Sequence, residues 1–225
     1  MTARVVLVSS PGYAPGPHWS HAAVQALARE LLARGAGVSW LAVARAGQPL
    51  PPAPPGVDLQ AMALRPPPGV ARVAADNRHL AVELALTAAA RATRLSAVVH
   101  VGVGARGSPN VCWLAERLGV RCFAIARAEE VVCHRGDLMF ADGSPCREFT
   151  DVERCRRCCT TSWWSRPPAD AFRNRGDLLA ASLMATETVF VRDANDRERL
   201  VAFGLAANAI TLGQEPGAIA ARLLG

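Results

Sequence analysis

The sequence predicts an α/β protein built on a Rossmann-like, doubly wound parallel sheet that carries a cysteine-rich insertion. Short apolar runs rich in valine alternate with amphipathic helical segments, and several of these segments end at glycine. Residues 127–168 interrupt this alternation and hold five of the seven cysteines. Strands that alternate with helices are typical of a parallel sheet covered by helices on both faces.

The first strand–helix–strand unit opens the chain. Residues 4–9, RVVLVS, form an apolar run stopped by a Ser-Pro-Gly turn, which predicts a strand buried on both faces. The next helix is predicted from Ser20, as its N-cap, to Gly35, because apolar residues recur on one face and glycine suits the position after a helix end. Residues 38–44 predict a second strand, parallel to the first because a crossover helix joins them.

The same alternation continues beyond a proline-rich excursion at residues 45–69, which contains one short strand candidate. The expected helices span residues 70–94, 111–119, 169–185 and 195–204, the expected strands span 57–64, 97–101, 120–126, 188–192 and 209–212, and an amphipathic turn covers 218–224.

The cysteine-rich segment, residues 127–168, lacks periodicity and is therefore expected to be an insertion. Two ligands two residues apart can chelate one ion, and four thiolates suit a closed tetrahedral zinc site. An iron–sulfur cluster also takes four cysteines, and unliganded thiols or a redox-labile pair are further alternatives, while Cys112 and Cys122 are expected in the core. The expected metal ligands have the spacing C-x12-C-x8-C-x2-C, with Cys159 adjacent: Cys133, Cys146, Cys155 and Cys158.

Ligands of open α/β sheets bind outside the carboxyl ends of the strands. The first such loop contains Gly12 and Gly16, which let the backbone approach a ligand, and the following helix start offers free N–H groups to an anion. This pattern predicts a phosphate or sugar site, with turn geometry alone as the alternative. The dinucleotide fingerprint GxGxxG is absent, and GVGARG at 102–107 imitates it only weakly.

Several titratable residues also fall at these strand ends. His18 and His21 flank the start of the first helix, where an imidazole either bonds a ligand or faces solvent. His100 ends a predicted strand and is either a cleft residue or a core histidine with satisfied nitrogens. Glu129 and Glu130 follow another strand and can serve as acid or base, unless they are solvated charges.

The composition narrows the classes of partner. The net charge of +6 permits anionic partners, but the arginines are dispersed and aromatic residues make up only 5%, so nucleic-acid binding is not expected. The sequence contains no uninterrupted run of about 18 apolar residues, which a membrane span requires. The first apolar run is too short for a secretory signal. A cytoplasmic location is therefore expected, where a reducing environment favours metal or redox chemistry over disulfides.

In order, these segments resemble the N-terminal half of the retaining glycosyltransferases of family 4, which have the two-domain GT-B architecture. The matching pieces include VVLVSSPGYAPG, SAVVHVGV, LAERLGVRCFAIA and TVFVRDANDRERLVAFG. The most distinctive piece is CHRGDLMFADGSPC followed by DVERCRRCC. The resemblance spans nearly the whole chain and implies one acceptor-binding domain over residues 1–225, with the cysteine-rich segment within it.

The resemblance also has two departures. Arg127 stands where the family usually has an active-site histidine, and Gly16-Pro17 stands where it has paired glycines. The chain ends at Gly225, about where the family's donor-binding domain begins, so a nucleotide sugar is expected to bind only with a partner domain. Arg127 is expected to contact a phosphate or an acceptor carboxylate. The implied lining of the interdomain cleft is Gly12, Gly16, His18, His100, Arg127 and Glu129.

Two functions from different classes follow from the resemblance and the departures. The first is the acceptor-side half of a glycosyltransferase that acts on a sugar acceptor together with a separate donor-binding chain. The alternative is a non-catalytic, metal-stabilised binding or scaffold protein derived from such an enzyme, and an iron–sulfur or thiol redox module is a third, weaker hypothesis. The sequence leaves open whether the chain is catalytically active.

Overall fold

Seven strands form one parallel sheet in the order β3-β2-β1-β4-β5-β6-β7. The strands are β1 (Arg4–Ser9), β2 (Gly37–Arg45), β3 (Val57–Leu64), β4 (Ala97–Val101), β5 (Arg121–Ala126), β6 (Thr188–Val191) and β7 (Ile210–Leu212). The computed structural model describes residues 2–10, 18–45, 49–50, 52–64, 79–104, 108–140, 142–160 and 169–225. The predicted Rossmann-like parallel sheet is confirmed.

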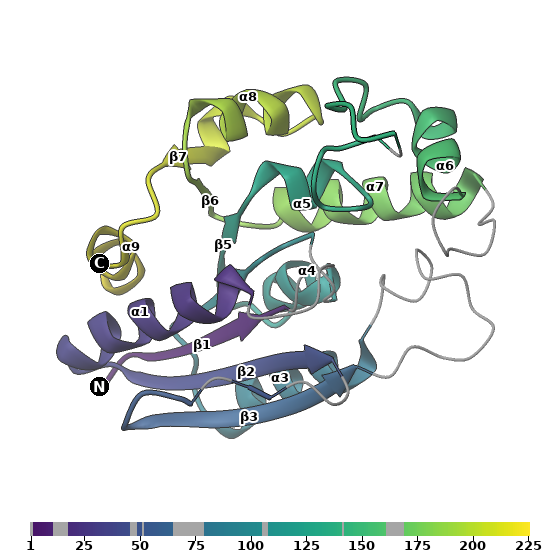
Figure 1. Ribbon diagram of the computed structural model, residues 1–225. Helices are drawn as coiled ribbons and strands as arrows, with labels where there is room; N and C mark the ends of the chain where they lie inside the picture. The colour runs from purple at the N-terminus through teal and green to yellow at the C-terminus, as the bar shows by residue number, and fades with distance from the viewer. Residues whose placement is uncertain are drawn as a thin grey trace.

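Helices cover both faces of this sheet (Figure 1). Apolar side chains of α1 and α9 pack on one face, and those of α3, α4 and α7 pack on the other. The helices among the described residues are α1 (Trp19–Ala33), α3 (Leu80–Ala92), α4 (Asn110–Arg117), α5 (Ala128–Val132), α6 (Val152–Thr160), α7 (Ala169–Met184), α8 (Ala194–Ala202) and α9 (Pro216–Leu224), with a 3-10 turn at Ala207–Ala209.

Strand β1 shows why the apolar runs are continuous. Val5 and Leu7 pack toward α1 and α9, whereas Val6 and Val8 pack toward α3 and α4. Successive side chains of a strand point to opposite faces, so a central strand covered on both faces has no position for an exposed polar side chain. All four side chains are at most 1% exposed.

The strand order reverses between β1 and β4. From β1 the chain builds outward through β2 to β3, and after returning it builds in the opposite direction from β4 to β7. Val5 pairs with Val38 of β2 on one side and with Ala97 of β4 on the other. Ligands of doubly wound sheets bind outside the carboxyl ends of the strands at such a reversal, so a ligand site is expected beyond the ends of β1 and β4.

Most predicted boundaries differ from the observed ones by one or two residues. The helix expected over 70–94 is observed as α3, and residues 65–78 lie outside the described part of the chain. The prediction of Ser20 as N-cap is wrong, because α1 begins at Trp19 and the Ser20 hydroxyl donates to the Ser10 carbonyl oxygen at 2.8 Å instead. Gly35, with a φ of 78°, has the left-handed conformation expected after a helix.

The cysteine-rich segment contains two helices that its composition did not predict, α5 and α6. Helix α6 packs against α7, away from strands β1–β3 (Figure 1). Between α5 and α6 the chain makes one antiparallel bridge, Met139 with Pro145.

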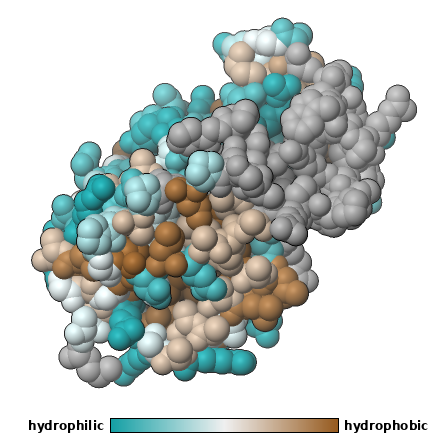
Figure 2. Space-filling view, turned by 60° about the horizontal axis from the view of Figure 1, so that its bottom comes forward, coloured by the Kyte–Doolittle hydropathy of each residue, from teal (hydrophilic) through white to brown (hydrophobic). Residues whose placement is uncertain are grey.

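The surface seen in Figure 2 mixes apolar and polar side chains, with an apolar patch in the middle of this face. Helix α3 exposes Leu80 and Leu84, and edge strand β3 exposes Leu59. Among the described helices, none has the length and apolar character needed to cross a membrane.

Candidate functional site

The start of α1 and the residues that follow β4 and β5 meet at the reversal point of the sheet. Gly102, directly after β4, has a φ of 80°, and a Cβ atom there would lie 3.1 Å from Cβ of Ser20 and 3.5 Å from Cε1 of His18. At Gly104, with a φ of 94°, a Cβ atom would clash with the Glu130 carbonyl and lie 2.7 Å from Cα of Val131. Glycine therefore allows three chain segments to pack directly against one another.

His18 and Glu130 form a part-buried hydrogen bond at this convergence. Nε2 of His18 lies 2.7 Å from Oε1 of Glu130, and their side chains are 12% and 8% exposed. The indole Nε1–H of Trp19 donates to the same Oε1 atom at 2.7 Å. The first turn of α1 thus supplies two of the groups that hold the carboxylate of α5.

The other ring nitrogen of His18 is engaged as well. Nδ1 lies 2.8 Å from Oγ of Ser20, which in turn lies 2.8 Å from the carbonyl oxygen of Ser10. The hydroxyl has one proton and cannot donate to both neighbours. If the hydroxyl donates to the Ser10 carbonyl oxygen, Nδ1 of His18 must be the donor in its contact with Ser20 and therefore carries a proton. The hydrogen bond between Nε2 of His18 and Oε1 of Glu130 then needs a second proton, carried by one of these two atoms. The orientation of this hydroxyl therefore decides whether Nδ1 of His18 donates to it or accepts from it.

Unpaired buried polar atoms are concentrated at this edge of the sheet. Of the seven such side-chain atoms among the described residues, four follow β5 or begin α8. A buried polar atom without a partner costs about 1–3 kcal/mol, so a group of them at a strand edge points to polar groups supplied by a ligand or by water. The four atoms are Arg127 Nε, Glu129 Oε2, Glu130 Oε2 and Asp196 Oδ2.

Arg127 and Glu129, two members of this group, have different neighbours. The guanidinium of Arg127 stacks over the Trp19 ring at 4.5 Å from its centre. Oε1 of Glu129 lies 3.7 Å from Nη1 of Arg192, which follows β6. These two predicted cleft residues therefore lie at the carboxyl ends of β5 and β6, and Arg127 shares Trp19 as a neighbour with Glu130.

Asp196 is the most deeply buried carboxyl group at this edge. Its Oδ1 atom lies 3.4 Å from both the backbone nitrogen of Ala128 and Nη2 of Arg192. Burial raises the pKa of Asp196, and the negative charge of Glu129 raises it further, against the opposing effect of Arg192. Asp193, which caps α8 by accepting the backbone N–H of Asp196, has its pKa lowered by that hydrogen bond and by Arg192.

Arg175 of α7 connects the residues after β4 with those after β5 through buried hydrogen bonds. The residue is 4% exposed, and its guanidinium donates to the carbonyl oxygens of Gly104 (2.7 Å), Glu130 (2.8 Å) and Val131 (3.0 Å). These acceptors belong to the segments after β4 and β5. One buried side chain therefore fixes the distance between the two loops that carry the site.

The remaining predicted residues are placed differently. His100 is 1% exposed. Its Nε2 atom lies 3.2 Å from Oγ of Ser10 and its Nδ1 atom lies 4.0 Å from Sγ of Cys112, so both ring nitrogens face buried groups of the protein. Burial lowers the pKa of His21, whose Nε2 contacts the carbonyl oxygen of Val43. Gly12 and Gly16 lie outside the described residues.

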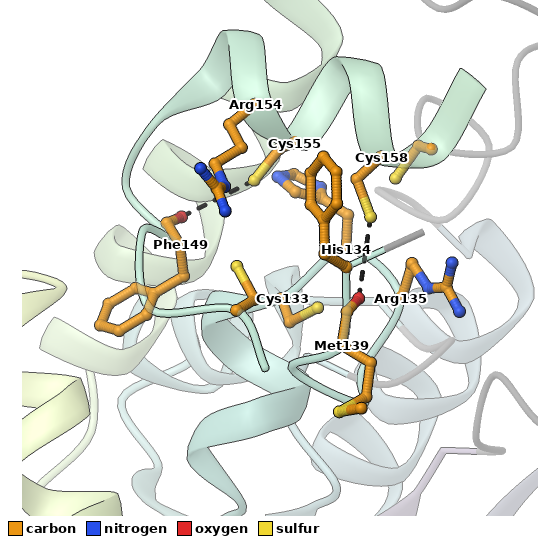
Figure 3. A pocket seen from close by; sticks show the side chains of 11 residues that line it. Cys133, His134, Arg135, Met139, Phe149, Arg154, Cys155 and Cys158 are labelled. Atoms are coloured by element: carbon orange, nitrogen blue, oxygen red, sulfur yellow. Dashed lines mark hydrogen bonds between the residues drawn. The ribbon is translucent and has the colours of Figure 1, made fainter. Parts of the chain in front are cut away.

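A second cluster, the thiol pocket, lies between α6 and the chain around residues 133–146. Figure 3 shows Cys155 and Cys158 entering it from α6, with Cys133 on the opposite side. The pocket leaves about 20 Å³, room for one water-sized particle. The lining includes all four predicted metal ligands, Cys159 and one histidine: Cys133, Cys146, Cys155, Cys158, Cys159 and His134.

The thiols in this pocket interact weakly with the surrounding backbone. Sγ of Cys155 lies 3.8 Å from the Phe149 carbonyl oxygen, and Sγ of Cys158 lies 3.7 Å from that of Met139 (Figure 3). Burial, followed by the proximity of the other sulfurs, raises the pKa of Cys155 to about 12. Within the described part of the chain, no three His, Cys, Asp or Glu side chains have the arrangement of a metal site.

Sequence reasoning missed several contributors to these two clusters. The predicted cleft residues include Glu129 but not Glu130, which is the carboxylate that meets His18. Nothing in the sequence singled out Trp19 or Arg175, whose roles depend on neighbours more than 40 residues away. The pattern CHRGD could have drawn attention to His134, because histidine beside cysteine is common in metal sites.

Comparison with known proteins supports the fold. No family model matches the chain, and no curated protein matches it by sequence. Among solved structures, UGT71G1 of Medicago truncatula complexed with UDP-glucose superposes with a TM-score of 0.53 at 10% identity, over 94% of this chain and 50% of that one. A variant of Os79 from O. sativa in complex with UDP gives 0.52 at 15% identity, over 92% and 50%.

These likenesses define one half of a GT-B fold. The chain spans about half the length of the solved structures that it matches. The doubly wound parallel sheet and the reversal point between β1 and β4 agree with that class.

Proposed function

We propose that the chain is the acceptor-side half of a glycosyltransferase and that a separate chain supplies the donor-binding half with its nucleotide sugar. The observation that carries this proposal is the His18–Glu130 pair at the reversal point of a GT-B half-domain. The likeness to structures in complex with UDP-glucose and UDP supports a nucleotide sugar as the donor. A reducing, cytoplasmic setting is part of this proposal, because the cysteine pattern of the sequence favours metal or redox chemistry over disulfides.

In this function Glu130 is the base. Its Oε1 atom is held by His18 and Trp19, whereas its Oε2 atom has no hydrogen-bond partner among the described residues. Oε2 accepts a hydrogen bond from the acceptor hydroxyl. As the hydroxyl oxygen bonds to the anomeric carbon, the bond from that carbon to the nucleoside diphosphate breaks, and the hydroxyl proton passes to Glu130.

The test uses the full chain co-purified with its donor-binding partner and incubated with UDP-glucose labelled in the sugar, alongside other labelled nucleotide sugars. We expect label to enter an acceptor from a cell extract, and we expect Glu130→Gln to lower the rate about 100-fold or more. Glu187→Gln is the matched control, because Glu187 pairs with Arg121 on the exposed surface near α9.

Two results would overturn this assignment. Full turnover by Glu130→Gln would show that the base lies elsewhere. A stable complex that transfers none of the labelled sugars would favour the alternative, a non-catalytic binding or scaffold protein.

A further inference from the structure

The four predicted metal ligands reach the thiol pocket from three separate chain segments. Cys133 directly follows α5, and Cys146 lies in the loop after the Met139–Pro145 bridge. Cys155 and Cys158 are three positions apart on α6 and therefore share one helix face. The fold thus gathers on one small pocket four soft ligands that are 25 positions apart from first to last.

The fifth cysteine of the segment has a different environment. Cys159 is 1% exposed and packs with Ala171 and Phe172 of α7 in a small apolar cluster. Its packing is that of a core cysteine, which behaves as a small apolar side chain. Cys159 thus borders the thiol pocket but is itself a member of the apolar cluster with α7, whereas Cys155 is only packed against that cluster.

His134 provides an independent sign of a ligand. It borders the thiol pocket, is 8% exposed and packs edge-on against Phe172 at 4.5 Å between ring centres. Its Nδ1 atom is buried and has no partner among the described residues. A thiolate sulfur in the pocket would accept a hydrogen bond from this nitrogen, as groups around metal ligands commonly do.

We propose that the thiol pocket binds one thiophilic divalent cation, with Zn²⁺ as the favoured ion, through the sulfurs of Cys133, Cys146, Cys155 and Cys158, and that His134 donates to one of these sulfurs. Each ligating thiol releases its proton to solvent. The four thiolates would hold the ion and would draw together around it, because the described side chains do not have the arrangement of a metal site without it. This inference does not depend on the proposed glycosyl transfer.

The test is a titration of the full, reduced and metal-free chain with Co²⁺, which reports tetrahedral thiolate coordination by its visible and near-ultraviolet absorption, followed by displacement with Zn²⁺. We expect one equivalent to bind. We expect the pair Cys155→Ala and Cys158→Ala to abolish the thiolate-to-cobalt absorption, and His134→Phe to weaken Zn²⁺ binding by about 10–100-fold.

Cys159→Ala is the matched control, because it removes a neighbouring thiol from the same helix, and we expect it to retain one equivalent. Loss of binding in that variant would overturn the ligand assignment. If the double variant fails to fold, the wild-type chain decides: absence of saturable Co²⁺ and Zn²⁺ binding overturns the proposal. Iron with inorganic sulfide in the chain as isolated without oxygen would replace it by an iron–sulfur cluster.

Discussion

His18 and Glu130 are 112 positions apart in the sequence, yet Nε2 of one lies 2.7 Å from Oε1 of the other. The contact forms only when the segment after β1 docks against the segment after β5, so it depends on the assembly of the central sheet. Both side chains are largely buried, and neither can exchange its partner for bulk water without local opening.

The first prediction concerns the stability that this pair contributes. We expect His18→Ala to lower the free energy of unfolding by about 1–3 kcal/mol, because it removes a hydrogen bond from the buried carboxylate of Glu130. Urea denaturation of the single variants His18→Ala and Glu130→Gln and of the double variant gives the coupling free energy between the two side chains. Additivity within about 0.5 kcal/mol would show that the two side chains do not interact in solution.

The second prediction concerns Arg175. We expect Arg175→Met to lower the free energy of unfolding by about 3 kcal/mol or more, because three buried carbonyl oxygens lose their common donor. Arg173→Ala on the same helix is the control, since Arg173 is exposed and forms a surface ion pair with Asp170, three positions earlier on α7. We expect it to change stability by less than about 0.5 kcal/mol. Equal effects of the two variants in urea denaturation would contradict the anchoring role.

The third prediction separates backbone strain from close packing. Gly104 and Gly119 both have positive φ, but only a Cβ atom at Gly104 meets neighbouring backbone; that at Gly119 meets open space. We expect Gly119→Ala to cost about 1–2 kcal/mol from strain alone. Gly104→Ala adds a clash of the new Cβ atom with the backbone of Glu130 and Val131, so we expect it to lower the free energy of unfolding clearly more than Gly119→Ala does. Equal melting temperatures for the two variants would argue against the tight contact after β4.

The fourth prediction concerns pH. Because the pKa of Asp196 is raised above its ordinary value of 3.8, the folded chain retains this proton to higher pH than the unfolded chain. The group's contribution to stability therefore falls as pH rises from about 3.8 to the raised pKa. We expect Asp196→Asn to reduce this fall, as measured by urea denaturation at a series of pH values.

Asp193 gives the control of opposite sign. Its pKa is lowered from 3.8, so its contribution is present above that pH and is lost as pH falls through the lowered value. Asp193→Asn should therefore lower stability above that pH and remove the slope of the stability profile that Asp193 causes on the acid side, leaving the slope above pH 3.8 unchanged. A wild-type profile that Asp196→Asn leaves unchanged above pH 3.8 would contradict the assigned environment.

The sheet was predictable because its strands are continuous apolar runs and its helices have one apolar face. Val5 to Val8 illustrate this, since burial on both sides leaves a plain signal in the sequence. Helix α5 shows the limit. It has five residues, too few to establish a periodic face, so the sequence could not distinguish Glu130, which faces His18, from Glu129, which faces Arg192.

The thiol pocket shows a similar division. The two-residue spacing between Cys155 and Cys158 predicted that they act together, and both line the pocket. The apolar packing of Cys159 and the unpaired Nδ1 of His134 arise from contacts with α7 and with the loop, and no local pattern encodes them.

The single hydroxyl proton of Ser20 has a mechanical consequence. The hydroxyl contacts both the Ser10 carbonyl oxygen at the end of the first strand and Nδ1 of His18, each at 2.8 Å, and its proton can serve only one of them. A rotation about one side-chain bond therefore changes which of the two is its acceptor, without any displacement of the backbone.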